Sequence, residues 1–147
     1  MSGLVPKDPE FEERVRDSFA RQRVMTTLGA SLTEVGPGRA EITLPFRDDL
    51  TQQHGFLHAG IVATIGDSAC GYAAFSLMPA DAGVLTVEYK INLLAPAKGT
   101  LFRAVGQVLR AGRTVTVATA EVRADEALIA VVTATVMAIY DRPDVRN

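Results

Sequence analysis

The first part of the chain carries apolar residues at helical spacing. Between residues 9 and 25, Phe11, Val15 and Phe19 recur every four positions among many charged side chains. This pattern is typical of an amphipathic helix, whose apolar stripe faces the interior and whose charged face meets water. We therefore predict an opening helix that packs one face on the domain.

Two segments of strand-like composition follow, at residues 28–35 and 39–46. The glycine and proline residues between them, at 36–38, form a strong turn signal, so the two segments predict a hairpin. Residues 47–57 show neither helical nor strand periodicity. They predict a polar loop, and such loops are common places for substrate contacts.

Residues 58–77 are the longest helical candidate, and Pro79 supplies a stop shortly after them. Apolar or small residues lie on both sides of this helix, with Ile61, Ile65, Tyr72 and Phe75 on one side and Ala59, Ala63, Gly66 and Cys70 on the other. A helix that is apolar nearly all round is typically enclosed by protein. We therefore predict a buried central helix.

The rest of the chain is rich in valine, threonine and isoleucine, which favour strands. Turn residues divide it into four segments, at 83–96, 100–109, 113–122 and 127–140. In the first of them, polar residues at even positions alternate with apolar residues at odd positions: Thr86, Glu88, Lys90 and Asn92 against Leu85, Val87, Tyr89, Ile91 and Leu93. We predict a meander of antiparallel strands, the first with one face in water.

The predicted order is helix, two strands, buried helix and four strands. This order indicates an α+β protein in which one curved antiparallel sheet wraps around the long central helix. At 147 residues and 48% hydrophobic composition, the chain is predicted to be a single domain over 1–147. Residues 1–25 form its N-terminal helix in this prediction, and residues 141–147 form a loose tail.

Asp67 stands alone in the predicted central helix. Between Asp49 and Asp81 the chain contains no other Asp, Glu, Lys or Arg. A buried carboxylate is costly unless it is paired, hydrogen-bonded or protonated, so a chain that keeps one either satisfies it locally or uses it in chemistry. The residues alone are compatible with both roles for Asp67, and we favour a role in chemistry.

Composition limits the classes of partner. A formal net charge of −2 and a pI near 5.7 provide no field for nucleic acid or an anionic membrane. The nearly uncharged run 50–80 contains glutamines, histidines, glycines and Asp67, so it is a poor membrane span. The single cysteine, Cys70, suits a reducing compartment, and acidic residues stand where a signal peptide would be apolar. We expect a soluble, cytoplasmic protein.

The layout and three sequence stretches resemble the hotdog-fold acyl-CoA thioesterases, in particular the PaaI-like branch of the phenylacetic acid pathway. The stretches are HGFLHAGIVATIGD, VLTVEYKINLLAPAKG and LRAGRTVTVATAEV. The family motif is His-Gly-Gly with an acid nine residues after the histidine, here His58-Ala59-Gly60 and Asp67. Gln52, six residues before His58, matches a family Asn or Gln. The resemblance implies a hotdog fold and hydrolysis of acyl-CoA thioesters to the free acid and coenzyme A, without a further cofactor.

Thioester hydrolysis needs an attacking carboxylate or activated water, and donors for the oxygen that becomes an oxyanion. Asp67 suits the first need, as nucleophile or as general base. By resemblance, the backbone N–H of Ala59 is the oxyanion donor, and the start of a helix offers such unpaired N–H groups. The side chain of Gln52 is a second candidate donor, or else a solvated loop amide.

Three further residues join the candidate site by position. His58 is either a structural cap of the helix or a catalytic group, and Gly60 completes the family tripeptide. In the resembling thioesterases, the position of Thr86 lies in the site. The hydroxyl of Thr86 is therefore expected to hold water or the carboxylate. Its alternative role is that of an ordinary strand threonine.

Helix geometry adds a constraint that the motif does not contain. Ala59 and Asp67 are eight residues apart, which is about 12 Å along one helix at about 1.5 Å per residue. The two groups of one chain therefore cannot reach the same carbonyl together. If both act, two chains share each site, which predicts a homodimer with two shared sites. The resemblance implies the same arrangement, often as a dimer of dimers.

Candidate coenzyme A contacts lie near two glycines at strand ends. Lys98, Arg110 and Arg113 are cations beside Gly99 and Gly112, where a phosphate can meet side-chain charge and exposed backbone N–H groups. By resemblance, Lys98 and the stretch Arg110, Gly112, Arg113 and Thr114 border the coenzyme A channel. The alternative is a charged rim that keeps the strand ends in water.

Other chemistries are less well supported. His54 and His58 have metal-ligand spacing, but no third protein ligand is placed near them, so we expect no metal. Cys70 has no evident base beside it, which argues against a thiol nucleophile. No GxSxG sequence is present, which argues against an esterase of the α/β-hydrolase type.

Two other functions stay open at this stage. A hotdog module that binds acyl-CoA as a sensor or carrier, without catalysis, would give tight binding and no thiol release. A hotdog dehydratase would produce an unsaturated acyl-CoA, but the histidine and distant acid of those enzymes are not found here. The acyl group itself is not determined by the residues, and the family resemblance implies short to medium acyl and aryl-acetyl groups.

Overall fold

The computed structural model describes residues 3–147 and contains three α-helices, one short 3-10 helix and six strands. The helices are α1 (Phe11–Arg21), α2 (Arg23–Leu28) and α3 (Ala59–Phe75), and the 3-10 turn is Asp48–Leu50. The strands are β1 (Ser31–Gly36), β2 (Arg39–Pro45), β3 (Gly83–Leu93), β4 (Leu101–Ala111), β5 (Val115–Ala124) and β6 (Ala127–Ile139). Each predicted strand and the central helix are present, with ends that move by a few residues.

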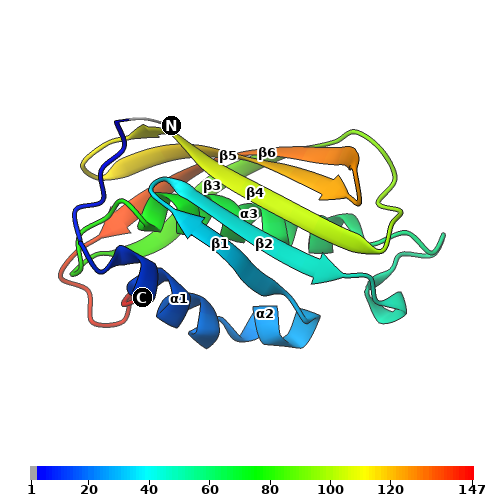
Figure 1. Cartoon of the computed structure of the whole chain (residues 1–147), viewed down its shortest axis with the longest axis horizontal. Coiled ribbons are helices and arrows are strands. Elements are labelled where there is room, and N and C mark those ends of the chain that lie inside the picture. Colours follow the sequence, from blue (N-terminus) through cyan, green and yellow to red (C-terminus); the bar gives the residue numbers. More distant parts are fainter. Residues whose placement is uncertain (1–2) are drawn as a thin grey trace.

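All six strands form one antiparallel sheet in the order β1-β2-β4-β5-β6-β3. The sheet curves over α3, which contacts five of its strands, from β2 to β3 (Figure 1). The predicted α+β architecture, a curved sheet around a central helix, is confirmed. The predicted meander is right for β4, β5 and β6 and wrong for β3. That strand pairs with β6 at the far edge of the sheet, because residues 94–100 cross the end of the sheet instead of turning tightly.

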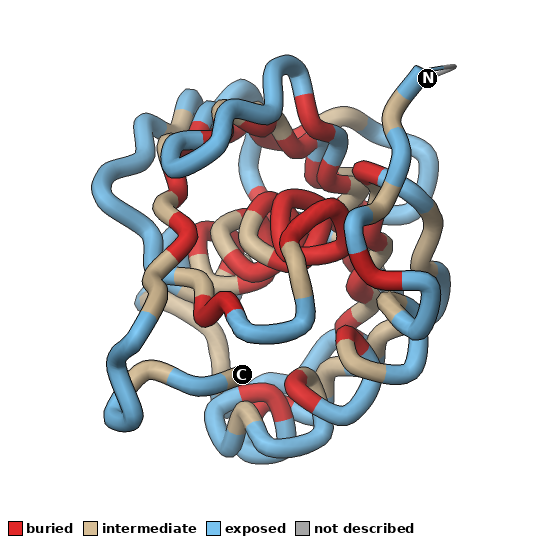
Figure 2. The backbone as a smooth tube through the Cα atoms, turned by 90° about the vertical axis from the view of Figure 1, so that its left-hand side faces the viewer, coloured by how far each residue is buried: buried red, intermediate tan, exposed pale blue. Residues whose placement is uncertain are grey.

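Helix α3 is buried because its side chains are small or apolar nearly all round. In Figure 2 it runs through the middle of the molecule, and the rest of the chain encircles it. The sheet lies closest to the helix where glycines remove the side chain: a Cβ on Gly106 of β4 would collide with the carbonyl group of Ala69 in α3. One cluster of buried residues, from Val15 in α1 to Ala138 in β6, surrounds the helix.

The predicted opening helix is two helices instead of one. Gln22 separates α1 from α2, because its backbone is extended (φ −79°, ψ 92°) and its N–H caps the carbonyl of Phe19. Residues 1 and 2 of the predicted range 1–25 lie outside the described part. The partly buried side chain of Arg14 ties α1 to the end of α3, donating to Met78 O at 2.7 Å and pairing with Asp8 at 2.7 Å.

The segment 141–147 is ordered against the domain, so the prediction of a loose tail is wrong. The side chain of Asn147 accepts a hydrogen bond from Val84 N at 2.9 Å and donates to Ser18 Oγ at 3.3 Å. The chain therefore closes beside α1 (Figure 1). Periodicity along a short polar segment carries no signal for such side-chain bonds to distant elements.

Strand β3 forms an edge of the sheet and exposes apolar side chains. Leu85, Val87, Tyr89 and Leu93 are 49%, 56%, 44% and 54% exposed. The prediction gave this strand one buried apolar face, and a single chain does not bury it. A long apolar edge with unpaired backbone groups is a template for pairing with another strand.

The longest helix in residues 3–147 is α3, at 17 residues. None of the helices described is long and apolar enough to cross a bilayer.

The close approach of β4 to α3 yields a stability prediction. Gly106→Ala places a methyl group against the backbone of Ala69, so we expect the free energy of unfolding to fall by about 1–3 kcal/mol. Gly36→Ala is the matched control, because a Cβ there meets nothing within 4 Å, and its effect should stay within about 0.5 kcal/mol. Denaturant unfolding of both variants measures the difference. Equal stabilities would show that the sheet can move away from the helix at no cost.

Candidate active site

The N-terminal end of α3 is capped by a side chain. His58 is in an extended conformation (φ −62°, ψ 138°), and its Nδ1 accepts a hydrogen bond from Gly60 N at 2.8 Å. Of the two roles considered for His58, the structure shows the cap. The N–H of Gly60 is consequently occupied and is not available as an oxyanion donor in this arrangement.

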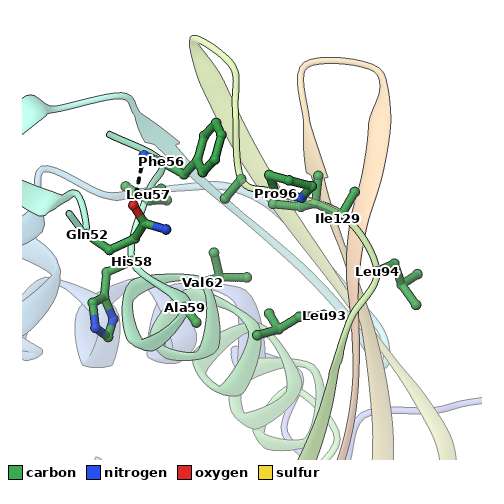
Figure 3. Close-up of a pocket in the computed structure, with 12 residues that line it drawn as sticks. Gln52, Phe56, Leu57, His58, Ala59, Val62, Leu93, Leu94, Pro96 and Ile129 are labelled. Atoms are coloured by element: carbon green, nitrogen blue, oxygen red, sulfur yellow. Dashed lines mark hydrogen bonds between the residues drawn. The ribbon is translucent and has the colours of Figure 1, made fainter. Parts of the chain in front are cut away.

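The N–H of Ala59 differs from that of Gly60. Within residues 3–147 it has no hydrogen-bond acceptor, and Ala59 is exposed at the mouth of a pocket of about 550 Å³. Apolar residues from the 52–57 loop, α3, β3 and β6 form most of the lining, among them Phe56, Val62, Leu93 and Ile129 (Figure 3). A free N–H at the positive end of a helix dipole suits a developing negative charge.

Gln52 lines the same pocket with a fixed orientation. Its side-chain oxygen accepts hydrogen bonds from His54 N at 2.5 Å and Phe56 N at 3.4 Å. Because both partners are N–H donors, the oxygen must face them, and Nε2 points away from the loop (Figure 3). Both predicted oxyanion donors, Ala59 and Gln52, therefore line one pocket.

Asp67 lies in the middle of α3, half-buried, in a separate small pocket of about 90 Å³. Its Oδ1 accepts a hydrogen bond from the Thr86 hydroxyl at 2.8 Å, and Oδ2 has no partner among residues 3–147. Burial raises the pKa of Asp67 above its usual range, and the bond from Thr86 opposes this rise. The result is a carboxylate with one oxygen held by Thr86 and the other free of contacts with the described part of the chain.

A β-bulge places Thr86 beside Asp67. The register of β3 on β6 shifts between Thr86 and Glu88, so Thr86 pairs with Val136 whereas Glu88 pairs with Thr135. Since Val136 is buried on the inner face of the sheet, its partner Thr86 faces α3. The sequence alternation placed Thr86 and Glu88 on one wet face, and this part of the prediction is wrong because the bulge adds one residue.

One chain does not bring the carboxylate and the oxyanion donors together. Ala59 and Gln52 line the large pocket, and Asp67 and Thr86 line the small one. The helical rise separates Ala59 from Asp67 by about 12 Å. The carboxylate and the oxyanion donors can act on the same substrate carbonyl only if they come from two chains.

The predicted coenzyme A residues do not form one patch in a single chain. Lys98 precedes β4, whereas Arg110 lies near its other end, and Gly112, Arg113 and Thr114 form the turn into β5. Strand β4 has 11 residues, so the two groups are about 30 Å apart. Grouping them by their neighbouring glycines was wrong for one chain, because glycines mark both ends of the same strand.

Other candidate chemistries can be placed as well. Cys70 is fully buried, and burial with the nearby Asp67 charge raises the pKa of its thiol to about 12, which opposes a nucleophilic role. Within residues 3–147, no three His, Cys, Asp or Glu side chains gather as a metal site.

Sequence reasoning missed three polar residues around Asp67. Gln22, Ser68 and Asn147 line the small pocket with it. Gln22 and Asn147 come from opposite ends of the chain, so no local spacing connects them to α3. Ser68 directly follows Asp67, and its position beside the acid was the one available signal.

Comparison with known proteins places this geometry in a family. Residues 54–131 match the Thioesterase superfamily. A solved thioesterase family protein from Silicibacter pomeroyi is 57% identical, with a TM-score of 0.86, over 88% of this chain and 98% of that one. The E. coli PaaI protein shares the fold, with a TM-score of 0.81 and 18% identity over 88% of this chain and 94% of that one.

Among curated relatives, a Listeria monocytogenes 1,4-dihydroxy-2-naphthoyl-CoA hydrolase is 25% identical, over 59% of this chain and 71% of its own. Relatives from Halobacterium salinarum and Saccharolobus solfataricus, named as esterases, are 29–35% identical, and the chain spans about two thirds of their length. The family match covers more than half of the chain and includes His58, Ala59 and Asp67. The chain belongs to the Thioesterase superfamily and has the hotdog fold of its PaaI-like members.

Proposed function

We propose that this protein hydrolyses acyl-CoA thioesters. The observation that carries the proposal is a pair of complementary groups on α3. Among the described residues, one oxygen of Asp67 and the N–H of Ala59 have no hydrogen-bond partner. Membership of the Thioesterase superfamily and similarity to a naphthoyl-CoA hydrolase support this chemistry. Coenzyme A is part of the substrate, and the reaction needs no other cofactor.

The proposed step uses each group once. The thioester carbonyl oxygen accepts hydrogen bonds from Ala59 N–H and Gln52 Nε2, which stabilise the negative charge that develops there. Asp67 Oδ2 either takes a proton from water as the water attacks the carbonyl carbon, or attacks that carbon itself and forms an anhydride that water then cleaves. In both routes the carbon–sulfur bond breaks and the coenzyme A thiolate leaves and is protonated. Thr86 holds Oδ1 and so orients the carboxylate.

A homodimer completes the site in this proposal. Each chain supplies Asp67 and Thr86 to one site, and Ala59 and Gln52 to the other. The exposed apolar edge of β3 supports such pairing, because a second chain would bury Leu85, Val87 and Tyr89 and satisfy the edge backbone groups. Thr86 belongs to this same strand, so the edge that pairs also carries part of the site. Pairing of two dimers is proposed from the resemblance.

The proposed coenzyme A contacts also come from two chains. Lys98 comes directly after Pro96 and Ala97, which line the large pocket, and this neighbourhood supports Lys98 as a phosphate contact. Arg110, Gly112, Arg113 and Thr114 lie at the far end of β4. They reach the same coenzyme A molecule only from a different subunit.

Replacing the carboxylate tests the assignment of Asp67. Asp67→Asn and Asp67→Ala are expected to lower turnover by about 10²–10⁴-fold, because neither side chain can attack or accept a proton. Release of free thiol from a panel of acyl-CoAs measures the effect. Near-wild-type turnover in both variants would exclude Asp67, and tight acyl-CoA binding without thiol release by the wild-type protein would favour a binding module.

The same variants separate a catalytic acid from a structural one. Folding raises the pKa of Asp67, so at pH 7 the ionised form opposes folding and an uncharged amide does not. Asp67→Asn should therefore keep or raise the melting temperature while activity falls. A large drop in melting temperature would indicate that the carboxylate stabilises the fold.

The hydrogen bond from Thr86 predicts a change in pH dependence. It favours the ionised carboxylate, so Thr86→Val should raise the pKa of Asp67 further and move the acid limb of kcat/KM to higher pH. Thr133→Val on the outer side of β6 is the matched control, since Thr133 is exposed and makes no side-chain hydrogen bond with residues 3–147. Superimposable pH profiles for wild type and Thr86→Val would contradict this role.

Mixing two inactive variants tests whether the sites are shared. Asp67→Asn chains retain Gln52, and Gln52→Ala chains retain Asp67, so a mixed dimer has one intact site and one site with both substitutions. Random exchange of chains makes half of the dimers mixed, which restores about a quarter of wild-type activity. Sites built within one chain would give no recovery. Full activity of a diluted monomer would equally oppose sharing.

A further inference from the structure

The small pocket beside Asp67 has a polar wall built from both ends of the chain. Gln22 comes from the break between α1 and α2, Ser68 and Tyr72 from α3, and Asn147 from the C-terminal segment. The pocket lies on the side of Asp67 away from the helix start, because Gly71 and Tyr72 of the following turn line it. Its volume of about 90 Å³ is that of about three water-sized groups, whereas a cavity that binds benzene holds about 150 Å³.

Most polar groups of this wall are already paired. Asn147 uses its oxygen for Val84 N and its nitrogen for Ser18 Oγ, and Ser18 Oγ also lies 3.2 Å from the hydroxyl of Tyr72. The Thr86 hydroxyl is held by Asp67. These groups shape the pocket and have little hydrogen-bonding capacity left for a ligand.

Gln22 is the exception. Its Oε1 accepts a hydrogen bond from Ser68 Oγ at 3.1 Å, which ties the side chain to α3. Its Nε2 has no acceptor among residues 3–147, and the side chain is half-buried. The helix break at Gln22 is what turns this residue toward α3, since its extended backbone ends α1 before α2 begins. The pocket therefore holds, beside the carboxylate, an amide N–H group without an acceptor among the described residues.

We propose that Gln22 is a specificity-determining residue, whose Nε2 donates to an oxygen on a short acyl group bound beside Asp67. This inference rests on the proposed thioesterase function. A four-carbon acyl group with a hydroxyl on its third carbon matches the pocket in size. The hydroxyl oxygen is then an acceptor that lies beyond the reacting carbonyl. The preferred substrates are short oxygenated acyl-CoAs, and unsubstituted acyl groups of the same length leave the donor unpaired.

The test compares 3-hydroxybutanoyl-CoA with butanoyl-CoA, which differ by one hydroxyl. The readout is the ratio of kcat/KM for the two substrates, which a general loss of activity does not move. Wild type should prefer the hydroxylated substrate, and Gln22→Met, which keeps the length and removes the donor, should lower the ratio by about 3–10-fold. Gln107→Met on the exposed side of β4 is the matched control and should leave the ratio unchanged.

A second variant keeps the test decisive if Gln22→Met does not fold. Ser68→Ala removes the hydroxyl that ties Gln22 to α3, and it should lower the same ratio by a smaller factor. An equal ratio in wild type, Gln22→Met and Ser68→Ala would overturn the proposal. Hydrolysis of other acyl-CoAs but of neither test substrate would overturn it and leave the thioesterase function standing, whereas no hydrolysis of any acyl-CoA would overturn both.

Discussion

The structure depends on enclosing an apolar helix within one curved sheet. Small residues make this packing possible: a side chain at Gly106 would meet the helix backbone, and a Cβ at Gly66 would approach Val132 Cγ2 to 2.8 Å. A helix held this way exposes little besides its N-terminal end and the flank toward β3. The polar groups of the proposed chemistry stand at these two places, Ala59 at the end and Asp67 on the flank.

The two places differ in how their polarity is set. At the helix start, the His58 ring occupies the N–H of Gly60 and leaves the N–H of Ala59 open, so a side-chain cap selects which backbone donor is free. On the flank, burial makes ionisation of Asp67 harder and a single hydroxyl makes it easier. A partly desolvated carboxylate is more reactive toward a carbonyl or a water than one that is fully hydrated.

The edge strand of the sheet and the segments near the two chain ends supply polar groups and exposed apolar surface that the core does not. Strand β3 combines an exposed apolar surface with the threonine that holds Asp67, so association and orientation of the carboxylate would depend on the same strand. The α1–α2 break and the C-terminal segment supply the polar wall beside the acid. The sheet thus provides a rigid frame, and segments added to it line the pocket.

The sequence by itself determined the elements, the enclosed helix and the placing of Asp67 within it, because periodicity and an isolated charge are local properties. Helical spacing also showed that Ala59 and Asp67 cannot meet within one chain. The tertiary structure decided the rest. Four features depend on partners distant in sequence. They are the pairing of β3 with β6, the bulge that turns Thr86 toward Asp67, the separation of about 30 Å between Lys98 and Arg110, and the approach of Gln22 and Asn147. Alternation along one strand cannot reveal an inserted residue, and turn signals cannot show which end of a sheet a loop occupies.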